Sequence, residues 1–195
     1  MEQVKALRDE TGVAVMQCKK ALEEAGGDIE KARMALRKKS GELAAKKSDR
    51  ALGAGVVAAY IHGVGSVGAM VELGCETDFV AKNEEFKKLA YDIAMHVAAL
   101  RPKYLSQKEV TDEDKEKAKA FFVEEVEKTM SGKPEEIKTK ALQGKMDTYF
   151  KELVLLDQPY VKDGTMTVGD LIKGAVQKFG ENTEIVRYSR FAVGK

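Results

Sequence analysis

Residues 72–83 read Glu72-Leu73-Gly74-Cys75-Glu76-Thr77-Asp78-Phe79-Val80-Ala81-Lys82-Asn83, and the rest of the chain is organised around them. The segment begins as an apolar, strand-like run and ends at Asn83, a residue type preferred at helix N-caps. Glu84 and Glu85 follow, where a helix dipole favours negative charge. The pattern predicts a strand, a polar connecting turn that carries one large aromatic residue, Phe79, and then a helix.

The helix predicted after Asn83 has a regular apolar face. Its apolar residues recur at helical spacing and are expected to face the core: Phe86, Leu89, Ala90, Ile93, Ala94, Val97 and Leu100. Phe79 lies outside this stripe, beside Asp78, whose charge a protein interior does not tolerate unpaired. An aromatic residue on a turn is more often a core residue, but an exposed one can anchor an interface with another protein. The residues alone leave both readings of Phe79 open.

Residues 1–50 have the pattern of a small three-helix module. A short helix containing Val4 and Leu7 is expected to stop near Thr11-Gly12, and a second covers about residues 15–25. Gly26-Gly27 supplies the positive φ that a helix terminus often needs, and Asp28 is the expected cap of a third helix. Many bundles of this size are docking modules for other proteins.

The sequence becomes basic between residues 31 and 50. The basic residues are Lys31, Arg33, Arg37, Lys38, Lys39, Lys46, Lys47 and Arg50, against Glu42 and Asp49 alone. A solvated helix and linker is the commonest meaning of such a run. A patch facing RNA or the ribosome and a contact with an acidic protein are the alternatives. The stretch has no interleaved aromatic residues, which disfavours single-stranded nucleic acid as its ligand.

Two hairpins are predicted in the remainder of the chain. Strand-like runs at about 53–61 and 67–73 enclose the glycine-rich residues 62–68 and predict a β-hairpin. Helices separated by Ser131-Gly132-Lys133-Pro134, with Pro134 at a first helical position, predict a helical hairpin over about 112–152. Its inward residues are expected to be Ala118, Phe121, Phe122, Val126, Ile137, Ala141, Leu142, Met146, Tyr149, Phe150 and Leu153.

The C-terminal region predicts one more helix and one more strand. Thr167 is the expected cap of a helix that runs to Phe179 and closes at Gly180. Residues 184–191 alternate like a strand with one buried face. Because the strands and helices do not alternate as βαβ units, the predicted fold class is α+β with an antiparallel sheet and packed helices.

No residue constellation predicts catalysis, a metal or a cofactor. Residues 63–68 match the G-x-G-x-x-G spacing, but a short strand follows where a dinucleotide site needs a helix, so a hairpin turn is predicted instead. His62, His96, Cys18 and Cys75 have no metal-ligand spacing, and His96 is expected to be a partly buried structural residue. The protein is therefore predicted not to be an enzyme.

Composition and charge narrow the class of protein. Charged residues make up 33% of the chain, the net charge is +1, and Trp is absent. This balance is typical of a globular protein and not of a strongly basic nucleic-acid binder. The sequence shows no signal peptide or membrane-length apolar run, and its two distant cysteines are expected to be reduced thiols. A cytoplasmic location without membrane association is predicted.

Three groups of residues resemble signatures of the elongation factor Ts family. Thr77-Asp78-Phe79-Val80 with Ala81-Lys82-Asn83 resembles the core signature. Residues 7–12, 16–22 and 27–29 resemble the amino-terminal signature, and residues 155–163 resemble a late motif of the same family. These motifs occur in the family's order and span most of the chain. Ala14, Gln17 and Gly74 depart from the usual residues at their positions, which leaves the fine contacts of the amino-terminal module open.

The resemblance implies a nucleotide-exchange factor for elongation factor Tu. Such a factor binds elongation factor Tu in its GDP-bound and nucleotide-free forms, displaces Mg²⁺ and promotes GDP release so that GTP can bind. The implied contact near the Mg²⁺ site comprises Thr77, Asp78, Phe79 and Val80. The implied second contact comprises Thr11, Gly12, Val13, Met16 and Lys19. Direct nucleic-acid binding is not expected, and an RNA-binding or ribosome-associated module using residues 31–50 is the alternative.

The resemblance also implies a domain organisation. Residues 1–50 would be a UBA-like three-helix docking module with a basic linker, and residues 51–195 an α+β core and dimerisation domain. The chain resembles the short members of the family, which lack a second core subdomain. A homodimer is implied to supply the missing surface and to give a 2:2 complex with elongation factor Tu.

Overall fold

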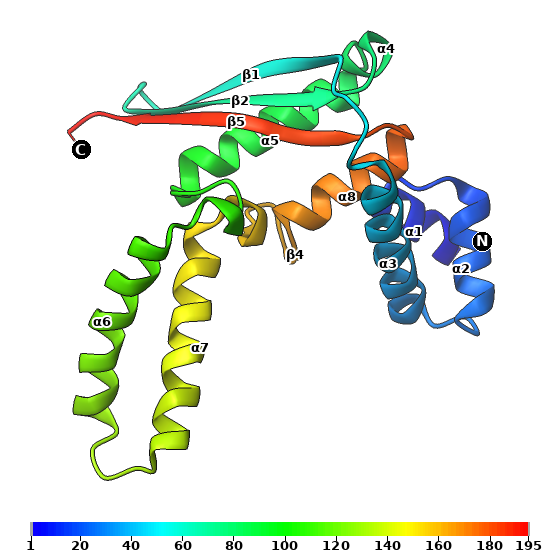
Figure 1. Ribbon diagram of the computed structural model, residues 1–195. Helices are drawn as coiled ribbons and strands as arrows, with labels where there is room; N and C mark the ends of the chain where they lie inside the picture. Colours follow the sequence, from blue (N-terminus) through cyan, green and yellow to red (C-terminus); the bar gives the residue numbers. More distant parts are fainter. Residues whose placement is uncertain (1, 195) are drawn as a thin grey trace.

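A computed structural model describes residues 2–194, and its first three helices form the predicted amino-terminal module (Figure 1). They are α1 (Glu2–Thr11), α2 (Val15–Glu24) and α3 (Ile29–Lys47). Leu7, Cys18 and Ala32 are fully buried among them. Asp28 caps α3 as predicted, with Oδ1 accepting hydrogen bonds from the backbone N–H groups of residues 30 and 31 at 3.0 and 3.1 Å. The third helix continues through most of the basic stretch, to Lys47.

A three-stranded antiparallel sheet forms the centre of the core. It is built from β1 (Ala54–His62), β2 (Val67–Cys75) and β5 (Thr183–Ala192), in the order β1-β2-β5. The β1–β2 pair is the predicted hairpin, and the absence of parallel pairing in this sheet confirms the α+β class. An irregularity between Glu72 and Leu73 shifts the β2–β5 register. As a result the alternation predicted for β5 changes phase within the strand, and Ile185 and Tyr188 both pack against the core.

Helix α5 (Glu84–Leu100) covers one face of this sheet (Figure 1). Asn83 caps it as predicted, accepting a hydrogen bond from the backbone N–H of Glu85 at 2.8 Å. Phe86, Ile93 and Val97 are fully buried against the strands. The prediction was wrong for Leu100, which is 41% exposed, because it is the last helical residue before the chain turns away at Arg101 in the left-handed conformation.

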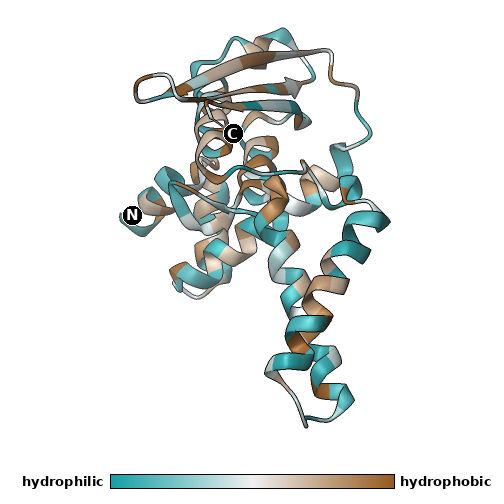
Figure 2. Cartoon of the chain, turned by 90° about the vertical axis from the view of Figure 1, so that its left-hand side faces the viewer, coloured by the Kyte–Doolittle hydropathy of each residue, from teal (hydrophilic) through white to brown (hydrophobic). Residues whose placement is uncertain are grey.

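The helical hairpin projects from the end of the molecule opposite the amino-terminal module (Figure 1). It consists of α6 (Asp112–Thr129) and α7 (Glu135–Leu153), preceded by η1 (Gln107–Glu109), and Pro134 is the N-cap of α7, not its first residue. In Figure 2 the hairpin stands clear of the rest of the chain. Phe121, Ile137 and Tyr149 were predicted to point inward but are 66%, 49% and 40% exposed. Two helices bury only a narrow stripe between them, and no third element of residues 2–194 packs over the hairpin to cover these side chains.

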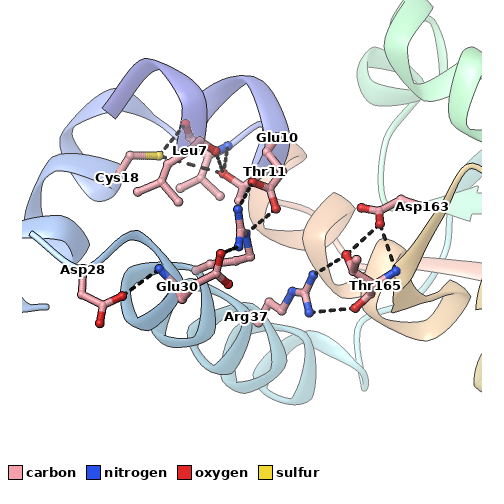
Figure 3. Close-up of polar contacts among 11 residues, drawn as sticks. Leu7, Glu10, Thr11, Cys18, Asp28, Glu30, Arg37, Asp163 and Thr165 are labelled. Atoms are coloured by element: carbon pink, nitrogen blue, oxygen red, sulfur yellow. Dashed lines mark hydrogen bonds and ion pairs between the residues drawn. The ribbon is translucent and has the colours of Figure 1, made fainter. Parts of the chain in front are cut away.

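The remaining elements connect the hairpin to the sheet. They are η2 (Leu155–Asp157), β3 (Pro159–Tyr160), β4 (Asp163–Thr167) and α8 (Val168–Phe179). Thr167 and Asp170 form a capping box at the start of α8, and Gly180 ends it with a φ of 73°. Helix α3 packs along α8. Arg37 adds a hydrogen bond from α3 to the Thr165 carbonyl on β4 at 3.0 Å, which helps to fasten the amino-terminal module to the core (Figure 3).

Candidate functional site

The segment between β2 and α5 is a one-turn helix, α4 (Asp78–Ala81), where the sequence predicted a turn. Its backbone closes between the Ala81 N–H and the Thr77 carbonyl at 3.2 Å, and between the Lys82 N–H and the Asp78 carbonyl at 3.0 Å. Thr77, at the N-cap, has extended backbone dihedrals. Successive residues of a helix are about 100° apart, so even one turn presents different side chains to the core and to solvent.

Phe79 is held outside the core. Its side chain is 83% exposed, whereas Val80 and Ala81 are 6% and 7% exposed and pack into the main hydrophobic cluster. Burying a phenylalanine side chain is worth about 1.5–3 kcal/mol, and this protein forgoes that gain at Phe79. An exposed ring on a fixed backbone is typical of an anchor for another protein. Of the two readings left open by the sequence, the structure supports the exposed one.

Asp78 places a carboxylate beside the exposed ring. Its side chain is 74% exposed and forms an ion pair with Lys82, one helical turn away. The hydrogen bond from the Lys82 ammonium is the main cause that lowers the pKa of Asp78. The carboxylate therefore stays charged at neutral pH. An aromatic ring and a negative charge are presented to solvent side by side.

Thr77 is fixed from a distant part of the chain. Its hydroxyl donates a hydrogen bond to Glu181 Oε1 at 2.6 Å, and its backbone N–H donates to Glu181 Oε2 at 3.0 Å. Glu181 follows Gly180 in the connection between α8 and β5. Glu181 is not among the residues predicted from the sequence, and no local pattern could have indicated it because the two residues are 104 positions apart.

The five residues implied as a second contact have different roles in the amino-terminal module. Val13 is 2% exposed and belongs to the core of the module. Thr11 donates a hydrogen bond to the Leu7 carbonyl and accepts one from the Val13 N–H at 3.3 Å, with Leu7 and Thr11 drawn in Figure 3. Gly12 has a φ of 67°, a conformation in which a side chain is strained. Thr11, Gly12 and Val13 therefore shape the turn between α1 and α2.

Met16 and Lys19 are the members of this set that face solvent from α2. The Met16 side chain is 73% exposed, and the Lys19 side chain is 57% exposed in an ion pair with Glu23. In Figure 1, α2 and α4 lie on the right-hand side of the molecule, while the α6–α7 hairpin is at the lower left. Both helices therefore lie away from the hairpin in this view.

Much of the basic stretch is engaged within the chain. Arg33 pairs with Glu10 and Glu30, Arg50 pairs with Glu76, and Lys47 donates a hydrogen bond to the Gly180 carbonyl. The hydrogen bonds that the Arg33 guanidinium donates to the Glu10 and Glu30 carboxylates raise its pKa above the ordinary value. These basic residues serve largely to stabilise the module and to join it to the core.

A cleft of about 360 Å³ lies where the amino-terminal module meets α5 and α8. Two ion pairs lie in its walls, Lys178 with Glu85 and Lys173 with Asp170. Within residues 2–194, no group of three or more His, Cys, Asp and Glu side chains is placed to hold a metal ion. The cleft offers no arrangement of nucleophile, base and orienting group.

His96 lies in the core, more deeply than the partly buried position predicted for it. It is fully buried; Nδ1 accepts a hydrogen bond from the Val161 N–H at 3.2 Å, and Nε2 lies 2.9 Å from Gln158 Oε1. With Nδ1 an acceptor, Nε2 carries the proton. Burial lowers the pKa of His96, so the ring is neutral and structural.

Comparisons with known proteins agree on one family. A family model described as "Elongation factor TS" matches residues 3–195. The chain is 47% identical over 192 residues to elongation factor Ts of Koribacter versatilis (strain Ellin345), covering 98% of this chain and 87% of that protein. It is 45% identical over 192 residues to elongation factor Ts of Coprothermobacter proteolyticus, covering 98% and 96%. It is 47% identical over 192 residues to elongation factor Ts of Thermosipho melanesiensis, covering 98% and 97%.

Proposed function

This chain belongs to the elongation factor Ts family and is a translation elongation factor, and we propose that it acts by binding elongation factor Tu in its GDP form and promoting release of the nucleotide. The observation that carries the proposal is the exposed ring of Phe79 on the anchored helix α4. The protein makes and breaks no covalent bond in this role, and it needs no cofactor of its own.

The proposed mechanism begins at the grip of the GTPase on its nucleotide. Such proteins hold the phosphates with a phosphate loop and Mg²⁺. Phe79 enters the partner near this site as a wedge, and Asp78 adds polar contacts that disturb the Mg²⁺. Thr77 and the buried Val80 hold the turn from which the wedge projects. Burying one phenylalanine side chain supplies about 1.5–3 kcal/mol, which offsets the cost of disrupting the partner's packing around the phosphates.

Linkage determines what exchange achieves. If the factor weakens GDP binding by a given ratio, GDP weakens factor binding by the same ratio. The factor therefore speeds exchange in both directions and gives no preference for GTP. The concentrations of GDP and GTP set the direction.

A stopped-flow experiment tests the proposal. Elongation factor Tu is loaded with a fluorescent GDP analogue and mixed with excess unlabelled GDP, with and without a substoichiometric amount of this protein. We expect release to accelerate and each molecule of factor to act many times. A release rate equal to that of elongation factor Tu alone would refute the function.

A second contact through α2 is proposed to add affinity. Met16 and Lys19 are the solvent-facing members of that set, and Met16 is the larger apolar anchor. Replacing Met16 with Ala should weaken the complex about fivefold or more, as expected for an interface side chain worth about 1 kcal/mol. Met34→Ala is the matched control, because Met34 is 62% exposed on α3. Equal affinities for the two variants would count against the contact, as would an unweakened complex after deletion of residues 1–50.

A homodimer is proposed to form through the outer face of the sheet. Figure 1 shows α5 on one face and no helix on the other. The uncovered face carries exposed apolar side chains: Val57, Ile61, Met70 and Phe191. Their alternation and the strand register place them on the same side. An exposed apolar sheet face is typical of an obligate dimer interface, which resembles a domain core cut in half. With one elongation factor Tu per protomer, the assembly is a 2:2 complex.

Light scattering after size exclusion tests the dimer. The 21.4 kDa chain should elute at twice its mass, and Ile61→Glu should shift it to the monomer. Ile137→Glu is the matched control, because Ile137 is 49% exposed on the hairpin. A wild-type monomer at the concentrations used for exchange would refute the dimer.

We expect the partner to be a protein and not a nucleic acid. The net charge is +1, and several residues of the basic stretch are paired within the chain. Capture of elongation factor Tu from lysate should survive nuclease treatment. Loss of all bound material on that treatment, with affinity for RNA that falls steeply with salt, would favour the alternative of an RNA-binding module at residues 31–50.

A further inference from the structure

Helix α4 is too short to be stable alone. It has four residues, whereas isolated helices below about 12–15 residues are marginal in water. Its N-cap residue, Thr77, makes no side-chain hydrogen bond to the helix itself. The orientation of α4 therefore depends on contacts from elsewhere in the chain. Val80 and Ala81 supply contacts on the core side of α4, where they pack into the main hydrophobic cluster.

At the start of α4, the dipeptides Glu76-Thr77 and Glu181-Asn182 are joined by reciprocal hydrogen bonds, an arrangement called here the clamp. Glu181 accepts two hydrogen bonds from Thr77, one from the hydroxyl and one from the backbone N–H. Glu76 accepts a hydrogen bond from the Asn182 backbone N–H at 2.6 Å. This contact is the main cause that lowers the pKa of Glu76. Each dipeptide thus provides a carboxylate for the other, and the clamp resists rotation as well as separation.

The clamp also reaches the linker that follows the amino-terminal module. Asn182 is 3% exposed, and its side-chain amide donates a hydrogen bond to the Arg50 carbonyl at 3.1 Å. The Arg50 guanidinium lies 3.4 Å from both Glu76 carboxylate oxygens. Three segments of the chain therefore meet at the base of α4: the end of the linker, the β2–α4 connection and the α8–β5 connection.

We propose that Glu181 is a positioning residue for nucleotide exchange, which acts through Thr77 to fix the direction in which α4 presents Asp78 and Phe79. The inference rests on the proposed function, because a direction matters only if Phe79 enters a partner. A wedge must meet its target in one orientation, and a helix with one anchored face could still pivot about Val80. The two hydrogen bonds from Glu181 remove that freedom at the opposite end of the turn.

Amide hydrogen exchange on the full chain tests whether Glu181 holds α4. In Glu181→Ala, we expect the hydrogen-bonded amides of residues 81–83 to exchange about tenfold faster, as expected for the loss of hydrogen bonds to a charged group. Glu125→Ala is the matched control, because it removes a carboxylate that bridges α6 to Lys145 on α7, far from α4. Unchanged exchange of residues 81–83 in Glu181→Ala would overturn the proposal.

The kinetics of GDP release distinguish a positioning role of Glu181 from a general structural effect. For Glu181→Ala with an unchanged melting temperature, we expect the maximal GDP-release rate at saturating factor to fall about tenfold, while the half-saturating concentration changes much less. Glu181→Gln keeps one carbonyl acceptor and should recover part of the maximal rate. A change confined to the half-saturating concentration, or no rescue by Gln, would contradict positioning.

Two further measurements keep the test decisive. If Glu181→Ala does not fold, Thr77→Val removes the hydroxyl donor from the other side of the same contact and should give the same faster amide exchange. If the wild-type protein releases no GDP from elongation factor Tu, the proposed function fails. The amide exchange of Glu181→Ala still reports whether the clamp holds α4, so the two failures are separable.

Discussion

Helices α4 and α5 place the same side chain in opposite environments seven residues apart. Phe79 on α4 is 83% exposed, whereas Phe86 in the first turn of α5 is fully buried. Phe86 packs edge-on against Phe179 of α8, with ring centroids 5.5 Å apart. A hydrophobic side chain thus stabilises this fold at one position and is kept available for another molecule at the other. The hydrophobicity of the residue does not decide between these uses.

The difference follows from how each helix is anchored. Helix α5 lies along the sheet and turns its apolar stripe toward the core, except for Leu100 at its end. Helix α4 is a single turn whose inward positions are already taken by Val80 and Ala81, so Phe79 has no interior to enter. Each phenylalanine should therefore affect one property of the protein and leave the other nearly unchanged.

Replacing Phe86 with Ala should give the largest effect, on stability. We expect the free energy of unfolding to fall by about 3–5 kcal/mol, because the variant loses a fully buried ring and leaves a cavity. Urea unfolding followed by circular dichroism measures the change. The fraction that remains folded should still release GDP from elongation factor Tu at the wild-type rate. A loss below 1 kcal/mol would show that Phe86 contributes no more to stability than an exposed phenylalanine does.

Replacing Phe79 with Ala should give the reverse result. Stability should change by less than about 0.5 kcal/mol, because the ring is exposed in the free protein. GDP release should slow about 10- to 100-fold, the loss expected for an interface anchor worth about 1.5–3 kcal/mol. Stopped-flow release at saturating factor measures it. Wild-type speed in this variant would break the comparison and the proposed mechanism with it.

Low pH should lower the stability of the protein through His96 on α5. Burial lowers the pKa of His96 below 6.5, so the unfolded chain binds a proton before the folded one does. Unfolding free energy should therefore decrease as the pH falls below about 6.5, by at most about 1.4 kcal/mol per pH unit. Denaturant unfolding between pH 7.5 and 5 measures the slope.

Two variants give that pH experiment its controls. His96→Gln removes the titrating ring from the core and should flatten the slope over this range. His62→Gln removes the exposed histidine of β1 and should leave the slope in place, because His96 is still present. An equal slope in all three proteins would mean that His96 is not its source.

The smallest effect is expected at a third phenylalanine, on the hairpin. Phe121 is 66% exposed and packs edge-on against Phe122, with centroids 5.3 Å apart. Phe121→Ala should lower the unfolding free energy by less than about 1 kcal/mol and leave GDP release unchanged. This variant shows whether exposure of an aromatic ring is sufficient for exchange. Slowed release would extend the interface to the hairpin.

Much of the fold could be predicted from local pattern. The caps Asp28, Asn83 and Thr167 mark helix starts that the structure contains, because capping depends on a few neighbouring residues. The inward face of the hairpin was harder to predict. Phe121 and Tyr149 have helical spacing with buried residues, but periodicity does not report whether a third element covers them.

The candidate site could be predicted only in part. Asp78 and Phe79 were singled out by their motif and by their place outside the stripe of α5, but whether Phe79 is buried or exposed was decided only by the structure. The role proposed for Glu181 had no signal in the sequence. It depends on the packing of α8 against the sheet, which brings the connection after Gly180 to the base of α4.

The sequence by itself determined the order of the longer helices and of the strands of the main sheet, the family, and the short stretch that carries Asp78 and Phe79. These properties depend on neighbouring residues, because caps, turns and periodic apolar faces act over a few positions. Only the tertiary structure decided that Phe79 stays in solvent while Phe86 is buried, and that Glu181 grips Thr77. Burial and long-range hydrogen bonds depend on which surfaces meet after the chain has folded, and a linear pattern does not contain that information.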